Sequence, residues 1–218
     1  MKYEKNFFAF LRKVKITSYL FYNYISKNVQ RTGNGKIYPY KRAVFDLAKG
    51  SKIILGEEDF IVNNNKPKGA KAEAYVKLQE DATLVITGKV TLNYNGTIEI
   101  HKGAAIEIGS GYINSGTVIL AKNKIKIGKN QLISRGCYIY DDDHHDIIDE
   151  YGKKLNTPKE VIIEDNVWIG LNSKILRGSV IGEGAMISAG SVVGGKIKAH
   201  TMALGNPARS YSEVKWRE

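Results

Sequence analysis

The stretch Val161–Val193, VIIEDNVWIGLNSKILRGSVIGEGAMISAGSVV, repeats with a period of six residues. The third place of each hexapeptide is a large aliphatic residue: Ile163, Ile169, Ile175, Ile181, Ile187 and Val193. The first place is small or β-branched: Val161, Val167, Ser173, Ser179, Ala185 and Ser191. A helix would repeat every 3.6 residues and a strand every two, so this period indicates a repeat architecture.

A solenoid of triangular coils accounts for the six-residue period. Each hexapeptide forms a short strand and a turn, and three hexapeptides complete one coil. The aliphatic side chain points inward and stacks on its equivalents in adjacent coils, while small residues and glycines let the chain turn each corner. The sequence therefore predicts an all-β solenoid, a parallel β-helix of hexapeptide repeats.

The regions upstream of this stretch divide into weaker repeats and a helical segment. Further aliphatic residues continue the repeat, the first three regularly and the others less so: Ile127, Ile133, Ile139, Ile100, Ile106 and Ile108. Residues 3–29 instead show apolar side chains at three-to-four spacings without proline, which is typical of a helix.

We expect three parts along the chain. Residues 1–50 would form an N-terminal helical and aromatic segment, and residues 51–210 the β-helix, with a protruding loop at about 140–160. Residues 211–218 would form a C-terminal tail.

Composition narrows the class of protein further. The 218 residues carry a formal net charge of +11, which implies an acidic partner such as an anionic membrane, a phosphate-bearing cofactor or nucleic acid. The single cysteine, Cys137, excludes an intrachain disulfide and favours a cytoplasmic location. Because no run of 18 apolar residues and no signal-peptide pattern occurs, we expect no membrane span.

The basic N-terminal segment has two open interpretations. Its cationic residues outnumber its one acid, Glu4: Lys2, Lys5, Arg12, Lys13, Lys15 and Lys27. As a basic amphipathic helix, residues 1–30 would contact anionic lipid at a membrane. Alternatively, the helix covers the open end of the β-helix or packs in an oligomer.

The segment Tyr140–Asp146, YDDDHHD, interrupts the repeat with four carboxylates and two of the four histidines of the chain. It has three interpretations: a metal site, a proton-transfer site or a charged, solvated loop. Carboxylates and imidazoles are ligands for zinc and other divalent ions. Excursions from a solenoid often carry function, which argues against a merely solvated loop.

Residues 50–210 resemble the hexapeptide-repeat acyltransferases, most of all the maltose, galactoside and capsule polysaccharide O-acetyltransferases. The resemblance is carried by Val161–Val193, by ALGNPAR (Ala203–Arg209) and by YDDDHHDII (Tyr140–Ile148). It implies a left-handed β-helix, a homotrimer, and acetyl-CoA as acyl donor in the groove between neighbouring prisms. It also implies that a histidine on a protruding loop acts as the base.

The resemblance further suggests which residues carry the chemistry. Capsule-type enzymes show an Asp-x-Asp-x-His-x-Ile pattern here, which selects His145 and leaves His144 at a variable position. A neutral imidazole can take the proton of an attacking hydroxyl near neutral pH. Asp143 and Asp146 are candidates to orient that ring. Asn114, about one and a half coils earlier, is the candidate donor to the developing oxyanion.

The resemblance likewise suggests the residues along the cofactor. Trp168 would stand beside the active groove, and small residues would lie against the pantetheine arm of the cofactor: Gly170, Ser188 and Ala189. Cationic side chains would meet its phosphates: Lys196, Lys198 and Arg209. Each has a structural alternative, namely a corner aromatic, the small residues that coil geometry needs, or a charged rim.

Rival functions remain open at this point. A γ-type carbonic anhydrase also uses such a β-helix, but its His-x4-His spacing is absent, so we expect no metal. An N-acetyltransferase acting on an amino or nucleotide sugar is the nearest enzyme alternative, and a non-catalytic β-helix binding module is the second. No nucleic-acid motif accompanies the charge. The favoured function is cytoplasmic acetyl transfer to a sugar hydroxyl in capsule, exopolysaccharide or lipopolysaccharide biosynthesis.

Overall fold

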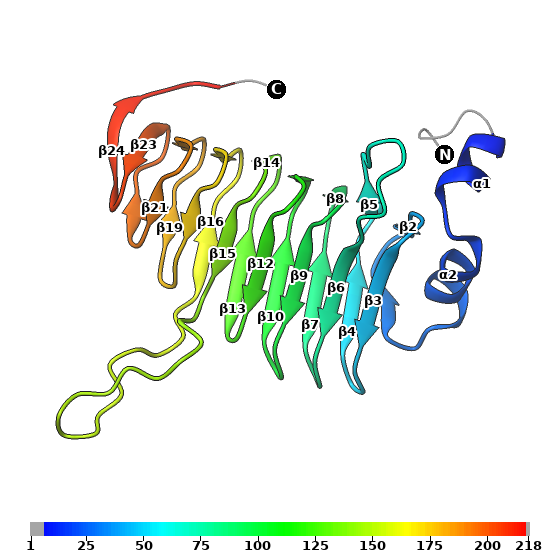
Figure 1. The fold of residues 1–218 in the computed structure, drawn as a ribbon, viewed down its shortest axis with the longest axis horizontal. Coiled ribbons are helices and arrows are strands. Elements are labelled where there is room, and N and C mark those ends of the chain that lie inside the picture. Colours follow the sequence, from blue (N-terminus) through cyan, green and yellow to red (C-terminus); the bar gives the residue numbers. More distant parts are fainter. Residues whose placement is uncertain (1–6, 217–218) are drawn as a thin grey trace.

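The computed structural model describes the backbone of residues 7–216 and shows a three-sided prism of stacked β-strands (Figure 1). The first sheet contains β1 (Val29–Arg31), β4 (Lys52–Leu55), β7 (Thr83–Ile86), β10 (Ala105–Ile108), β13 (Lys124–Ile127), β16 (Val161–Ile163), β19 (Val180–Ile181) and β22 (Lys196–Ile197), in that order. The second contains β2 (Ile37–Pro39), β5 (Phe60–Asn64), β8 (Val90–Asn93), β11 (Gly111–Ile113), β14 (Gln131–Ile133), β17 (Trp168–Ile169), β20 (Met186–Ile187), β23 (Thr201–Gly205) and β24 (Ala208–Glu213). The third contains β3 (Ala43–Leu47), β6 (Ala74–Leu78), β9 (Thr97–Ile100), β12 (Val118–Ala121), β15 (Tyr138–Tyr140), β18 (Lys174–Ile175) and β21 (Val192–Val193).

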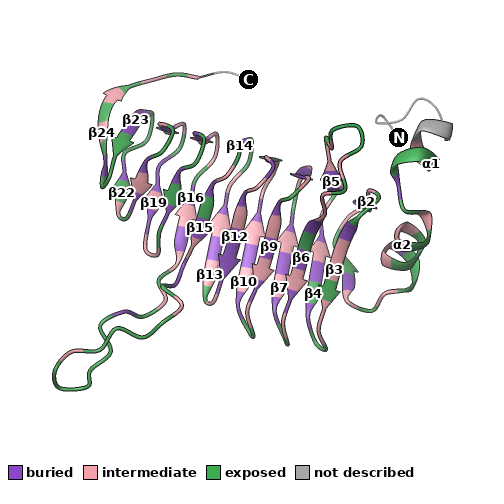
Figure 2. Cartoon of the chain, viewed as in Figure 1, coloured by how far each residue is buried: buried purple, intermediate pink, exposed green. Residues whose placement is uncertain are grey.

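Within each sheet every strand pairs in parallel with its equivalents one coil away, and the inward side chains form continuous columns. Ile106 of β10 lies between Leu84 of β7 and Ile125 of β13, and all three are fully buried. Buried and more exposed residues alternate along the strands (Figure 2). The irregular upstream coils therefore bury the same kind of column as the regular hexapeptides downstream.

The parallel sheets begin earlier than residue 51. β1, β2 and β3 lie at residues 29–47 and are already members of the three sheets. The division of the chain into three parts stays a prediction.

The helical segment is shorter and more broken than the expected helix over residues 3–29. It consists of α1 (Phe7–Lys13), α2 (Ile16–Leu20) and a π-helical turn, η1 (Phe21–Ile25). The break falls at Val14, which forms an antiparallel bridge to Tyr40, and at Lys15, whose backbone is extended. Residues 3–6 of the expected helix lie outside the described residues.

This segment covers the N-terminal end of the prism. Val14 packs with Tyr38 and Ile61 on the outer face of the second sheet, and the ring of Tyr22 lies 4.6 Å from that of Phe45. The buried side chain of Asn23 accepts the N–H of Ile37 (3.0 Å) and donates to its carbonyl (2.8 Å). These contacts fix the helical turns to the first coil.

A long loop and a C-terminal hairpin leave the regular course of the coils. Residues 141–160, between β15 and β16, leave the coils as a long loop with one antiparallel bridge, Ile148 to Lys154 (Figure 1). At the C-terminal end of the prism, β24 turns back antiparallel to β23. The ring centroid of Trp216, which follows β24, lies 6.1 Å from that of Trp168. None of the helices in the described residues has the length and apolar character needed to cross a membrane.

Candidate active site

The long loop starts from a buried carboxylate at the corner between the third and first sheets. Asp141 follows β15 directly, is fully buried, and accepts the backbone N–H groups of Lys122 (2.7 Å) and Asn123 (2.8 Å). Burial raises the pKa of the Asp141 carboxyl, and the bonds from these N–H groups partly offset the rise. The first residue of the loop is thereby tied to the turn of the preceding coil.

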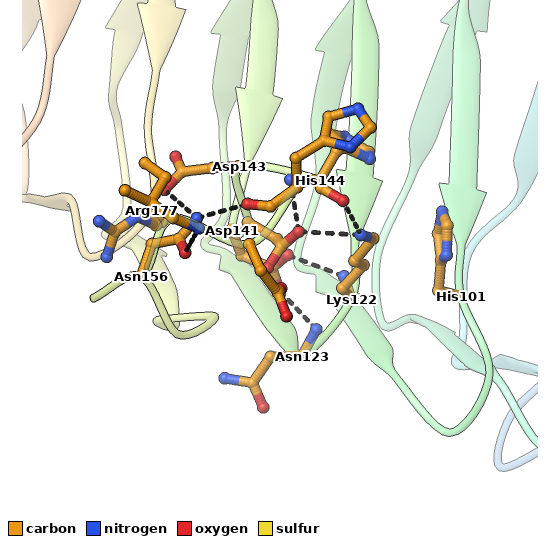
Figure 3. A network of polar contacts seen from close by, with 12 residues as sticks. His101, Lys122, Asn123, Asp141, Asp143, His144, Asn156 and Arg177 are labelled. Atoms are coloured by element: carbon orange, nitrogen blue, oxygen red, sulfur yellow. Dashed lines mark hydrogen bonds and ion pairs between the residues drawn. The ribbon is translucent and has the colours of Figure 1, made fainter. Parts of the chain in front are cut away.

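Two side chains hold the backbone of His144, that of Lys122 (Figure 3) and that of Asp142. Asp142 accepts the N–H of His144 (2.6 Å) and pairs with Lys122 Nζ (3.0 Å), which also donates to the His144 carbonyl (3.1 Å). Although burial alone would raise the pKa of Asp142, the hydrogen bonds from Lys122 and from the His144 N–H lower it. His144 itself has a φ of 66°, in the left-handed region that few side chains adopt.

The ring of His144 stands on the outer face of the third sheet among other aromatic rings. Its centroid is 5.4 Å from Tyr140 and 6.1 Å from His101, and both contacts are edge-to-face. His101 follows β9, two coils before the loop, and burial followed by the charges of nearby cations lowers its pKa in spite of Glu99. The imidazole of His144 is thus half-buried, and both its ring and its backbone have identified partners.

His145, the histidine selected by the sequence pattern, lies in a different setting. It is exposed, and its recorded contacts are made by its backbone, with the Asp143 carbonyl (2.9 Å) and Asn156 Nδ2 (2.7 Å). Within the described part of the chain, no hydrogen bond or ring contact reaches its imidazole.

The two carboxylates predicted to orient a histidine have other partners. Asp143 pairs with Arg177 Nε (2.5 Å) and accepts a bond from Asn156 (3.1 Å), whereas Asp146 pairs with Lys154 (2.6 Å). Asp143 and Asp146 are neighbours of the histidines in the sequence. In the structure, however, their carboxylates bond to other residues of the loop and of the prism, and these bonds fix the shape of the loop.

Asn114 lies away from this corner. It follows β11, between the second and third sheets, where its amide donates to the Ile133 carbonyl (3.1 Å) and accepts from Asn93 Nδ2 (2.9 Å). Asn114 precedes β12 of the third sheet, whereas His101 and His144 follow the carboxyl ends of β9 and β15 in that sheet. In one prism the structure does not bring Asn114 and the histidines together.

The residues expected along the pantetheine arm share one corner. Gly170 donates to the Ile187 carbonyl (2.7 Å), and a Cβ at Gly170 would lie 2.6 Å from the Ala189 nitrogen, so this corner needs glycine. Ser188 and Ala189 continue the same corner one coil later. Trp168 faces outward from β17 and donates to Ser134 Oγ (3.2 Å).

The cationic residues expected at the phosphates are spread over the C-terminal end of the prism. Lys196 begins β22 in the first sheet, whereas Arg209 pairs with Leu204 across the β23–β24 hairpin of the second sheet. Lys198, in the next turn, donates its N–H to Ser210 (3.0 Å). The structure does not gather them at one point.

Sequence reasoning missed four residues of the site: His101, Lys122, Asn156 and Arg177. Lys122 lies opposite Asp142 because Leu120 and Tyr140 are register partners, a register that only the structure shows. Asn156 and Arg177 carry no sequence signal either, since a loop of irregular course connects them to Asp143.

The comparisons with known proteins agree with this fold and place its hexapeptides. The family model of the bacterial transferase hexapeptide (six repeats) matches residues 160–195. The polysialic acid O-acetyltransferase of Neisseria meningitidis is 30% identical over 128 residues, which is 57% of this chain and 59% of the relative. The galactoside O-acetyltransferase of Escherichia coli strain K12 is 32% identical over 119 residues, 53% of this chain and 58% of the relative.

Two solved structures show the same architecture. The polysialic acid O-acetyltransferase OatWY superimposes with a TM-score of 0.64 at 23% identity, covering 87% of this chain and 91% of that one. The polySia-specific acetyltransferase NeuO gives a TM-score of 0.52 at 24% identity, covering 88% and 90%. At this identity the likeness shows the fold, and the predicted left-handed parallel β-helix with an N-terminal helical segment is confirmed.

The chain therefore has a β-helix fold with hexapeptide repeats at residues 160–195, and its resemblance to the hexapeptide-repeat O-acetyltransferases is confirmed. It spans about half the length of the curated relatives that it matches, 44% of one and 58% of another.

Proposed function

We propose that the protein transfers an acetyl group from acetyl-CoA to a sugar hydroxyl, in the assembly of a capsule, an exopolysaccharide or a lipopolysaccharide. The observation that carries this proposal is the half-buried ring of His144, held at the root of the loop of a β-helix that is similar to O-acetyltransferases. Such a ring can serve as a positioned proton acceptor.

The sequence pattern selects His145 as the base, and that choice stays a prediction. The geometry favours His144, because its backbone is fixed by Asp142 and Lys122 and its ring contacts Tyr140 and His101. His145 has an exposed ring without such contacts. A base must keep one position relative to the acceptor, so the better-held histidine is the better candidate.

The proposed reaction needs no covalent acyl-enzyme. The imidazole takes the proton of the acceptor hydroxyl as its oxygen attacks the thioester carbonyl, which gives a tetrahedral oxyanion. When that oxyanion collapses, the carbon–sulfur bond breaks and the imidazolium returns the proton to the departing thiolate. Cys137 is buried, and burial raises the pKa of its thiol, so it is a poor alternative nucleophile.

The remaining predicted residues fit a homotrimer, which we propose as the active form. Asn114 precedes a strand of the third sheet, whereas the histidines of the same chain follow strands of that sheet, so they lie at opposite ends of these strands. Asn114 would therefore stabilise the oxyanion beside the histidine of a neighbouring copy. We propose that the pantetheine arm follows the corner of Trp168, Gly170, Ser188 and Ala189. Lys196, Lys198 and Arg209 would then attract the cofactor phosphates.

We also propose a cytoplasmic location with membrane contact through residues 1–30.

The test of this function is thiol release from acetyl-CoA against a panel of sugars, amino sugars, nucleotide sugars and polysaccharide fragments. Release that depends on a hydroxyl acceptor, with an O-acetylated product, supports the proposal. Product acetylated on an amino group would favour the N-acetyltransferase alternative. If no acceptor works and calorimetry shows no CoA binding, the proposal is wrong and the binding-module reading replaces it.

Lys122 offers a sharper test of the site. Lys122→Met keeps the aliphatic stem but removes the bonds to Asp142 and to the His144 carbonyl, so kcat should fall roughly tenfold or more as the histidine loses its position. The KM for acetyl-CoA should change little, and Lys122→Arg should restore most of kcat. Lys124→Met is the matched control, because Lys124 also pairs with a carboxylate, Glu107, but on the outside of the first sheet. A rise in KM with kcat unchanged would exclude a positioning role for Lys122.

A further inference from the structure

The positive charge of the chain is concentrated in its first 50 residues, and those described, 7–50, lie at the end of the prism that the helical segment covers. Residues 1–50 hold eleven Lys and Arg against two acids, Glu4 and Asp46. The other 168 residues hold the remaining twenty-two cationic residues against twenty acids and are close to neutral. Most of the net charge of +11 therefore belongs to the first 50 residues. The described residues of this part, 7–50, hold nine Lys and Arg against one acid, Asp46, and so give this end of the prism a positive potential.

The same end exposes an apolar surface, which we call the apolar stripe: Leu20 (48% exposed), Phe21 (45%), Tyr24 (65%) and Ile25 (68%). The stripe lies on the end of α2 and on η1, and its spacing of one, three and one residues places it on one side of these helical turns. The other side holds the buried Asn23 and the ring of Tyr22 against the prism. The segment is thus amphipathic, with its apolar side directed away from the fold.

Cationic side chains flank the apolar stripe. Lys15 immediately precedes α2 and Lys27 follows η1, both are exposed, and neither forms an ion pair with any described residue. Lys36 Nζ lies 5.8 Å from the centre of the Tyr24 ring. Aromatic and aliphatic side chains bordered by lysine are the pattern of helices that lie in the interface of an anionic bilayer.

We propose that the apolar stripe and its flanking lysines dock the prism, by its N-terminal end, on a bilayer that contains anionic lipid. A nucleic acid would use the charge and could stack bases on Phe21 and Tyr24, but it would leave the aliphatic Leu20 and Ile25 in water, whereas a bilayer takes up all four side chains as well as the charge. The long loop leaves the prism farther along its length (Figure 1), so docking at this end leaves the candidate active site open. This inference gives the membrane contact of the proposed function a definite surface.

Vesicle flotation of the full chain tests the proposal, with phosphatidylcholine vesicles made with and without phosphatidylglycerol. Wild type should bind only the anionic vesicles, and salt should release it. Lys15→Glu combined with Lys27→Glu should weaken binding at least about twentyfold. Phe21→Ser combined with Ile25→Ser should weaken it at least about tenfold.

Matched controls separate a docking surface from general charge and stickiness. Lys129→Glu with Lys153→Glu makes the same charge change at exposed positions away from this end. Ile148→Ser with Leu171→Ser makes the same apolar change at side chains that are 63% and 47% exposed. Both controls should bind like wild type.

Three results would overturn the proposal: no binding of wild type to anionic vesicles, equal loss in the control variants, or an altered mass of Phe21→Ser/Ile25→Ser by analytical ultracentrifugation. The last result would assign the apolar stripe to a contact between copies of the chain. Binding is measured without acetyl-CoA or acceptor, so failure here leaves the proposed acetyl transfer standing.

Discussion

His144→Asn is expected to lower kcat for acetyl transfer by about a hundred- to ten-thousand-fold, the usual contribution of a positioned general base. Asparagine is the right substitute because His144 has a φ of 66°, and asparagine tolerates the left-handed region that alanine resists. The backbone bonds to Asp142 and Lys122 therefore survive the change. The loss should fall on kcat, while the affinity for CoA and the far-ultraviolet circular dichroism stay as in wild type.

The matched control is His145→Asn, which removes the exposed imidazole one residue away. It should keep a rate within about threefold of wild type, since no hydrogen bond or ring contact from a described residue reaches that imidazole. Loss in His145→Asn with retention in His144→Asn would reverse the assignment and support the sequence pattern. Equal loss in both would show that the loop, and no single ring, had been damaged. Retained rates in both would remove histidine catalysis from the proposed function.

The contrast between the two histidines shows where sequence reasoning stops. A spacing pattern treats Asp141–Ile147 as a linear string, in which His145 takes the catalytic place. The direction of each ring is decided instead by the backbone, and the backbone is set by Lys122 on the preceding coil and by Asn156 later in the loop. Such contacts join residues that no local pattern relates.

The β-helix itself could be predicted because its period is a local property. Each inward aliphatic residue, such as Ile169, satisfies the same steric demand as its equivalents in the coils on either side, so the demand recurs every six residues. The helical segment could not be predicted to the same precision. Its break at Val14 results from pairing with Tyr40, a tertiary contact that outweighs the local helical pattern.

The corner that we propose for the cofactor could be predicted only in part. Gly170 and Ala189 are fixed by coil geometry, and the period brings them to one corner. Lys196 and Arg209 depend on how the chain ends, where β24 turns back along β23. The sequence marks those two residues as cationic but does not indicate that they lie on different sheets.

Ile106→Ala is expected to lower the free energy of unfolding by about 2–5 kcal/mol, because it leaves a cavity in a column whose neighbours cannot close it. Ile106 is fully buried between Leu84 and Ile125, both held in register by backbone pairing. Glu107→Ala, one residue on and facing outward, should change the value by less than about 1 kcal/mol, since it removes only a surface pair with Lys124. Chemical denaturation followed by circular dichroism measures both.

The position of Ile106 makes this comparison a test of how far the coils act as one unit. In a repeat protein each coil contacts only its neighbours, so a weakened middle coil can separate the two halves. Both tryptophans, Trp168 and Trp216, lie C-terminal to β10, so their fluorescence reports on the regular hexapeptide coils, while circular dichroism reports on every strand. If Ile106→Ala unfolds in one step by both signals, the irregular coils share a single core with the hexapeptides. If fluorescence changes at higher denaturant than circular dichroism, the regular coils are stable without the irregular ones. Equal destabilisation by Glu107→Ala would contradict the inward and outward alternation on which this fold rests.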